Sequence, residues 1–295
     1  MKIKLIIIIV IFVMIFSLSC ERKASVDENE IIKPKTNIEY AGVRASTYGI
    51  QPFPEPEKWV EMINSMKGYF EGSKPVVVWI IGIVDDDVNC RLHFPNKSDK
   101  TYKNIVFDNE DLSERYLNYF DKNNINVFLQ VEPANADVDV LIDIVLKRYG
   151  KHSSVIGYGV DIEWYKENDY KKCGKKLDDK TAEEWEKRVK SYNSEYVLFV
   201  KHWDIEWLPP NYRGELIFVD DSQMFGTFND MKKEFVQWAD KLYPNKVWFQ
   251  IGYPADEKWW KEFNNPPQYM GKAISLKIKQ KTGILWVDFT LKKIF

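Results

Sequence analysis

The chain has 295 residues, of which 45% are hydrophobic and 29% are charged, so it is long enough for one sizeable globular domain. Its formal net charge of -2 argues against a polyanionic partner such as nucleic acid. The 11 Trp, 16 Tyr and 17 Phe residues supply many rings, which serve either as core packing or as the floor of a cleft for sugars.

The N-terminal segment has the pattern of a targeting signal. Lys2 and Lys4 precede the apolar run Leu5–Phe16, which is short for a membrane-spanning helix of about 20 residues. Small residues and Cys20 follow, and this order resembles a bacterial lipoprotein signal. The resemblance implies cleavage before Cys20, a lipid on Cys20, and a protein anchored to the outer face of a bacterial membrane. An ordinary signal or an uncleaved anchor is the alternative.

Three domains are expected: a signal peptide over residues 1–20, a polar tether over residues 21–37 and a folded domain over residues 38–295. Only Cys90 and Cys173 then remain. In an exported protein this pair could form a disulfide, since both fall just after predicted strand ends. Two separate thiols are the alternative, because disulfide geometry is strict.

From residue 39 onward, apolar strand patterns alternate with amphipathic helix patterns. The predicted strands lie at Glu39–Gly49 (with its loop), Pro75–Val84, Ile125–Val131, Val155–Trp164, Tyr196–Val200, Glu215–Val219, Val247–Gly252 and Gly283–Phe289. The predicted helices lie at Glu57–Phe70, Asp111–Asn123, Val138–Tyr149, Thr181–Tyr192, Asp230–Leu242, Glu257–Phe263 and within Tyr269–Lys279, and Asp85–Asn109 is predicted to be a loop.

Eight strands over about 250 residues match a (β/α)8 TIM barrel of the α/β class. The rival fold is an open doubly wound sheet, which is weakened because no Gly-rich phosphate loop follows the first strand.

In a TIM barrel the active site lies at the carboxyl ends of the strands. Polar and aromatic residues concentrate at these ends: Arg44, Tyr48, Asp85, Asp86, Asp87, Gln130, Glu132, Asp161, Glu163, Lys201, His202, Trp203, Asp220, Asp221, Gln223, Gln250, Tyr253, Trp286 and Asp288. A cleft rich in carboxylates, amides and rings suits glycoside hydrolysis, which needs a carboxylic acid to protonate the leaving oxygen.

The fourth strand carries the strongest candidates. Its apolar run ends in Asp161 and Glu163, and alternate residues of a strand point the same way, so both acids are expected on one face. Burying an unpaired carboxylate is costly, so we expect both to open into a cleft. The alternative is that these acids form a surface contact or an ion pair at the strand end.

The segment Asp161-Ile162-Glu163-Trp164 resembles the end of the family 18 glycoside hydrolase signature, found in chitinases and endo-β-N-acetylglucosaminidases. The resemblance implies that Glu163 is the general acid and that Asp161 orients the N-acetyl group of the substrate, whose carbonyl oxygen attacks the anomeric carbon. The two earlier acids of the signature fall on Ile156 and Gly159 in this chain. Trp286 resembles the ring that the family places under the sugar.

This reading predicts a membrane-tethered monomer that binds β-linked N-acetylhexosamine glycans without a metal or cofactor. The residues expected to bind the substrate are Tyr48, Gln130, Glu132, Trp203, Asp220, Asp221, Gln223, Tyr253 and Trp286. Two other functions stay open. The missing signature acids favour a glycan-binding protein without catalysis, and the acidic run Asp85–Asp87 leaves room for a metal-dependent hydrolase, although a solvated loop is the simpler reading.

Overall fold

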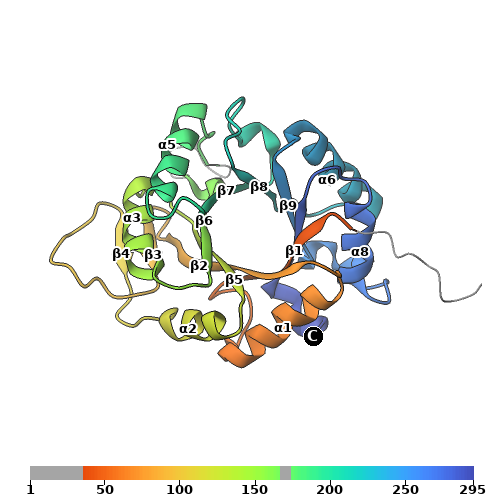
Figure 1. Ribbon diagram of the computed structural model, residues 1–295, viewed down its shortest axis with the longest axis horizontal. Coiled ribbons are helices and arrows are strands. Elements are labelled where there is room, and N and C mark those ends of the chain that lie inside the picture. The colour runs from red at the N-terminus through yellow and green to blue at the C-terminus, as the bar shows by residue number, and fades with distance from the viewer. Residues whose placement is uncertain (1–35, 167–173) are drawn as a thin grey trace, which may run out of the picture. The chain divides into compact units, whose positions relative to one another are not determined.

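The structure, a computed structural model, describes residues 36–166 and 174–295. It confirms the (β/α)8 barrel, since eight parallel strands form a closed ring in which the first pairs with both the second and the last (Figure 1). The eight strands are β1 Ile38–Ala45, β2 Lys74–Asp85, β5 Asn126–Val131, β6 Val155–Asp161, β7 Val197–His202, β8 Ile217–Asp220, β9 Lys246–Ile251 and β10 Thr282–Val287.

Two short strands extend the sheet outside the barrel, in the segment predicted to be a loop. β3, Asn89–Leu92, pairs antiparallel with the end of β2, and β4, Ile105–Phe107, pairs parallel with β3. The loop prediction was wrong here because strands of four and three residues are too short to show a hydrophobic period among the surrounding polar residues.

Helices cover the outside of the barrel. In the described residues the α-helices are α1 Pro56–Gly68, α2 Glu114–Lys122, α3 Val138–Tyr149, α5 Asp179–Lys190, α6 Phe228–Leu242, α7 Glu257–Trp260 and α8 Pro266–Ser275. The 3-10 turns are η1 Ile162–Trp164, η2 Ile205–Trp207, η3 Pro254–Asp256 and η4 Asp288–Lys293. The connection from β7 to β8, all of which the structure describes, contains only η2, so the barrel wall beside α6 lacks a covering helix there.

The barrel interior is filled by side chains from alternate strand positions. The inner cluster consists of Val76, Val78, Phe128, Phe199, Ile217, Val219, Trp248 and Leu285, all buried. Gly157 and Gly159 face the same interior, because a Cβ on either would lie 2.3 Å from the ring of Phe128 or 2.0 Å from the ring of Phe199. The rings therefore fill the space that glycine leaves on β6.

The same alternation determines which side chains point inward at the ends of the strands. Residues two positions beyond the inner cluster must also point inward, at the carboxyl-terminal mouth of the barrel.

The described chain joins the barrel at its N-terminal side through Asn37, whose Nδ2 donates a 2.6 Å hydrogen bond to the Ile278 carbonyl. The signal peptide and most of the tether predicted for residues 1–37 lie outside the described residues.

None of the helices formed by residues 36–166 and 174–295 is long and apolar enough to cross a membrane.

Candidate functional site

A ring of polar side chains closes the mouth of the barrel above the apolar inner cluster. Each member follows an inward residue of its strand by two positions, so it points inward as well. The ring consists of Arg44 after Gly42, Gln130 after Phe128, Asp161 after Gly159, Lys201 after Phe199, Asp221 after Val219 and Gln250 after Trp248. All six are buried, so this polar layer forms the floor of the mouth.

Lys201 links two carboxylates of this floor. Its Nζ lies 2.7 Å from Oδ2 of Asp161, the neighbour in register on β6, and it also contacts Oδ2 of Asp221. The three residues are 3%, 2% and 5% exposed. Oδ1 of Asp161 and Oδ1 of Asp221 are buried and have no hydrogen-bond partner among the described residues. These two acceptor oxygens are buried with their hydrogen-bonding capacity unmet. The expectation that Asp161 opens into a cleft was wrong, since it is 2% exposed, paired with Lys201 and absent from the lining of the groove described below.

The charge state of this cluster follows from burial and from the pairing. Burial alone would lower the pKa of Lys201, but the carboxylates of Asp161 and Asp221 raise it well above its usual value, so Lys201 stays charged. Burial raises the pKa of Asp161 well above its usual value, against the lowering effect of Lys201, and the nearby charge of Asp221 adds to the rise. Asp161 therefore accepts a proton more readily than an exposed carboxylate does.

The opposite side of the mouth is held by a second buried ion pair. Arg44 donates to Oδ1 of Asp288 at 2.6 Å, and the other carboxylate oxygen accepts from the backbone N–H and the hydroxyl of Ser46 at 2.5 and 2.7 Å. Arg44 also contacts the hydroxyl of Tyr48, which donates to Glu132 at 2.5 Å. These bonds fix the phenol of Tyr48, which is 42% exposed, at the rim.

The two candidate acids are not placed as alternate residues of one strand. β6 ends at Asp161, and Ile162–Trp164 forms the 3-10 turn η1, in which Ile162 is buried and Glu163 is half-buried. The expectation of a shared strand face was therefore wrong. Glu163 nevertheless stays near the cluster, since its charge acts on both Asp161 and Lys201.

Glu163 lines a groove of about 880 Å³ that runs from the mouth along α6. The loops after β7 and β8 form one wall, and Glu234, Gln237, Trp238 and Lys241 of α6 form the other. These α6 positions share one helix face. They are open to the groove because the β7–β8 connection carries the short turn η2 in place of a helix.

The exposed indole of Trp203 lies in this groove with the carboxylates of Glu163 and Asp221. Trp203 is 40% exposed and lines the groove together with Glu163 and Asp221. Behind it, its ring is stacked on Trp207 at 6.5 Å, and Trp207 is stacked on His202 at 5.4 Å. The stack holds the indole in place, and a fixed ring next to acids is a surface suited to the C–H face of a sugar.

The structure brings most of the predicted substrate-binding residues together at the mouth. Asp221, Gln223 and Trp203 line the groove with Glu163, while Tyr48, Gln130, Glu132 and Tyr253 belong to the mouth, where Tyr253 lies within electrostatic reach of Arg44, Lys201, Asp161 and Asp221. Arg44, Lys201, Gln250 and Asp288 also lie at predicted strand ends, but the sequence pattern alone indicates no role for them. The signal that could have identified Arg44 and Lys201 is a cation at an inward-facing position of a buried strand.

Two predicted residues do not reach the groove. Trp286 is fully buried in the outer core, where its ring packs against Trp260 at 5.3 Å and its Nε1 donates to Thr290. Asp220 is fully buried and accepts from the backbone N–H of Ser222 at 2.9 Å, and burial raises its pKa well above the usual value. Both residues have the outward parity of their strands, so their neighbours Val287 and Asp221 take the inward positions.

The predicted disulfide stays a prediction, because Cys173 lies outside the described residues. Cys90 is on β3, fully buried, and burial raises the pKa of its thiol.

Among the described residues no group of three or more His, Cys, Asp or Glu side chains is placed to hold a metal ion. In the acidic run, Asp85 pairs with Arg91 at 2.5 Å and Asp86 accepts hydrogen bonds from Asn89.

The groove wall after β8 depends on Asp256, which gives a first prediction. This carboxylate is 3% exposed and accepts from the Phe225 N–H at 2.8 Å, and burial raises its pKa to about 6. A raised folded-state pKa contributes stability below about pH 3.8 that is lost as the pH rises toward 6. Asp256→Asn keeps the acceptor and removes the charge.

We therefore expect Asp256→Asn to raise stability at pH 7.5 by about 1–2 kcal/mol, or a Tm increase of roughly 2–5 °C. The gain should disappear below pH 4, where Asp256 is neutral in the wild type too. Thermal unfolding followed by circular dichroism at both pH values measures this. A lower Tm of the variant at pH 7.5 would show that the ionised hydrogen bond outweighs the cost of burial.

Comparisons with known proteins give little beyond the fold. No protein-family model and no curated protein matches the chain. Among solved structures, it is similar to the crystal structure of a "putative alpha-L-fucosidase" from Bacteroides thetaiotaomicron, with 13% sequence identity, coverage of 88% of this chain and 91% of that chain, and a TM-score of 0.47. A likeness this distant does not indicate an activity for this chain.

Proposed function

We propose that this chain is a glycoside hydrolase that acts on β-linked N-acetylhexosamine glycans, with Glu163 as the general acid. The observation that carries the proposal is that Glu163 and the exposed indole of Trp203 line one groove at the carboxyl-terminal mouth of the barrel. Glycosidic bond cleavage requires an acid that protonates the leaving oxygen, and an exposed ring beside that acid can stack on the sugar. Hydrolysis of a neutral glycan also fits a mouth in which carboxylates outnumber cations.

In the proposed reaction the two acids have different roles. Glu163, half-buried beside the groove, protonates the glycosidic oxygen as the bond to the anomeric carbon breaks. The acetamido carbonyl oxygen of the sugar forms the new bond to that carbon. Water then displaces the acetamido oxygen and returns a proton to Glu163, so the enzyme is regenerated.

Asp161 supports this step from the floor. Its Oδ2 is held by Lys201 at 2.7 Å, which leaves the unpartnered Oδ1 to accept the N–H of the acetamido group. A fixed acceptor would orient the acetamido group for attack and favour the positive charge that develops on it.

A second candidate is a glycan-binding protein without turnover. The observation that favours it is the pairing of Asp161 and Asp221 with Lys201, together with Ile156 and Gly159 at the positions of the two earlier signature acids. Such a protein would keep the groove and its indole but release no product.

Calorimetry with chito-oligosaccharides, run beside an assay for new reducing ends, separates the two functions. Binding with release of reducing ends supports the hydrolase, and binding without release supports the second candidate. If neither binding nor release is seen with chito-oligosaccharides, the proposed substrate class is wrong.

The role of Trp203 in binding gives a second prediction. Trp203→Ala removes the exposed ring but none of the carboxylates, so we expect about 10-fold weaker affinity for the glycan, roughly 1.4 kcal/mol. Tyr243→Ala is the matched control, since Tyr243 is 58% exposed at the C-terminal end of α6, which lies away from the mouth. Equal affinities of the Trp203 and Tyr243 variants in calorimetry would remove Trp203 from the site.

We also propose that the protein is exported and held at the membrane by a lipid on Cys20, as the N-terminal pattern predicts. In cells that express the full chain, a labelled fatty acid should be incorporated into the wild type, and Cys20→Ser should abolish this label because no thiol remains at the cleavage site. Full labelling of the Cys20→Ser variant would contradict the assignment.

A further inference from the structure

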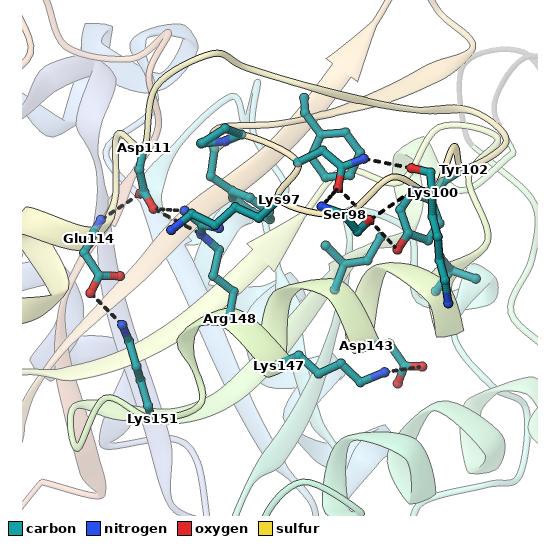
Figure 2. Close-up of a pocket in the computed structure, with 16 residues that line it drawn as sticks. Lys97, Ser98, Lys100, Tyr102, Asp111, Glu114, Asp143, Lys147, Arg148 and Lys151 are labelled. Carbon is teal, nitrogen blue, oxygen red and sulfur yellow. Dashed lines mark hydrogen bonds and ion pairs between the residues drawn. The ribbon is translucent and has the colours of Figure 1, made fainter.

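A second cavity, of about 910 Å³, lies on the outer side of the barrel between the β3–β4 loop and α3. It shares no residue with the groove of Trp203 and Glu163. Among the side chains labelled in Figure 2, Lys97, Ser98, Lys100 and Tyr102 come from the loop, and Asp143, Lys147 and Arg148 come from α3, with Lys151 just beyond it.

Cations outnumber acids in this cavity. Five cationic residues line it, Lys97, Lys100, Lys147, Arg148 and Lys151, against the three acids Asp111, Glu114 and Asp143, which leaves an excess of two positive charges (5 − 3 = 2). Each of these acids already forms an ion pair with a cationic side chain. Asp111 is paired with Arg148 at 2.5 Å and Glu114 with Lys151 at 2.7 Å.

The third acid, Asp143, is neutralised from outside the cavity. Arg188 of α5 donates to it through Nε at 2.7 Å and forms a second contact through the guanidinium. Lys147 is therefore only a distant partner of Asp143, at 3.6 Å. Lys97 and Lys100 form no ion pair in the described part of the chain. Lys97 and Lys100 on the loop, and Lys147 on α3 with its long contact to Asp143, can therefore meet an anion from both walls.

The floor of the cavity is apolar and its one guanidinium is fixed. Phe107, Val140 and Ile144 are half-buried and contribute to the lining. Arg148, whose side chain is 17% exposed, lies 4.8 Å above the ring of Phe94 and is held by two hydrogen bonds to Asp111, at 3.0 and 2.5 Å. An apolar floor under a cationic rim fits a ligand that has both a ring face and an anionic group.

We propose that this cavity binds a phosphorylated saccharide, with the phosphate held by the lysines of the two walls and the sugar ring on the apolar floor. A phosphate monoester carries a charge of about -1.5 to -2 at pH 7, which two or three lysine ammonium groups can balance. Its three acceptor oxygens can be shared among several ammonium donors, a role that lysine commonly fills. The site stands independently of the hydrolase proposal, because it uses none of the same residues.

Calorimetry of the full folded chain with glucose 6-phosphate, glucose and inorganic phosphate tests the proposal at low salt. We expect glucose 6-phosphate to bind at least about 10-fold more tightly than either of the other two, and more weakly as salt is raised. Equal affinity for inorganic phosphate would overturn the saccharide part, and no binding of glucose 6-phosphate would overturn the whole site.

A paired variant keeps the test specific for the cavity. Lys97→Ala with Lys147→Ala should weaken glucose 6-phosphate binding at least about 10-fold, since it removes one ammonium group from each wall. The control is Lys180→Ala with Lys187→Ala, the same charge change on the exposed face of α5, where the side chains are 83% and 71% exposed. Equal losses in both variants would reduce the effect to net charge and contradict the site.

Discussion

Glu163→Gln is expected to lower the rate of glycan hydrolysis at least about 10²-fold, the usual contribution of a general acid. The amide keeps the shape of the side chain and its place in η1 but has no proton to give to the leaving oxygen. Glycan affinity should change little, because Trp203 and the floor of the mouth are untouched. Rates of reducing-end release and calorimetric affinities, measured on the same preparations, check both parts.

Substrates with different leaving groups test this prediction more specifically. An aryl glycoside with an acidic phenol needs less help from a general acid than an oligosaccharide does, so the loss in Glu163→Gln should be smaller for the aryl substrate. A loss that is the same for both substrates would indicate damage to the site and not the removal of a proton donor. A variant as fast as the wild type on both would show that Glu163 is not the acid.

The chain supplies a closely matched control in a second copy of the same tetrapeptide. Asp204-Ile205-Glu206-Trp207 repeats the sequence of residues 161–164, and its last three residues also form a 3-10 turn, η2. Glu206, however, is exposed on the surface and paired with Lys241. Glu206→Gln should leave the rate within about 2-fold of wild type, since this carboxylate lies outside the groove lining.

The same repeat shows how far the sequence could predict the site. One Asp-Ile-Glu-Trp segment ends a buried barrel strand, and the other follows β7 on the surface, so the local residues do not decide the location. The barrel was predictable because eight apolar segments, separated by helical periods, leave few ways to bury them all. The position at the mouth then followed from the carboxyl ends of those strands.

The details that were missed depend on where each strand stops and on its parity. The sequence extends the fourth strand to Trp164, because Ile162 and Trp164 continue an apolar pattern, yet the pairing with β7 ends at Asp161. Likewise, Trp286 and Val287 both lie in a strand buried on each face, so hydrophobicity cannot show which one points inward. The groove is open because the connection between β7 and β8 contains no α-helix. No short sequence motif predicts that a helix is absent there.

The largest effect on stability is expected from Lys201→Met, which should lower the free energy of unfolding by about 3–5 kcal/mol at pH 7. Lys201 is the cation between two buried carboxylates, so its removal leaves Asp161 and Asp221 uncompensated in the floor of the barrel mouth. Methionine retains the length and the apolar stem of lysine, so little packing is lost. Urea unfolding measures the change, with Lys246→Met as the control for a more exposed pair, Lys246 with Glu39 at 2.6 Å, where less than about 1 kcal/mol is expected.

The pH dependence distinguishes lost charge compensation from lost packing. Without Lys201, the pKa of Asp161 should rise further, because burial is no longer opposed by a cation. A group whose folded-state pKa is raised loses its contribution as the pH increases through that pKa, so the deficit of Lys201→Met should be large at pH 7 and shrink as the pH falls toward 4. Adding Asp221→Asn should recover part of the loss at pH 7, since one buried charge is then removed. A deficit that is independent of pH, and is not reduced by Asp221→Asn, would mean that Lys201 acts through packing alone and that Asp161 does not depend on it for its charge.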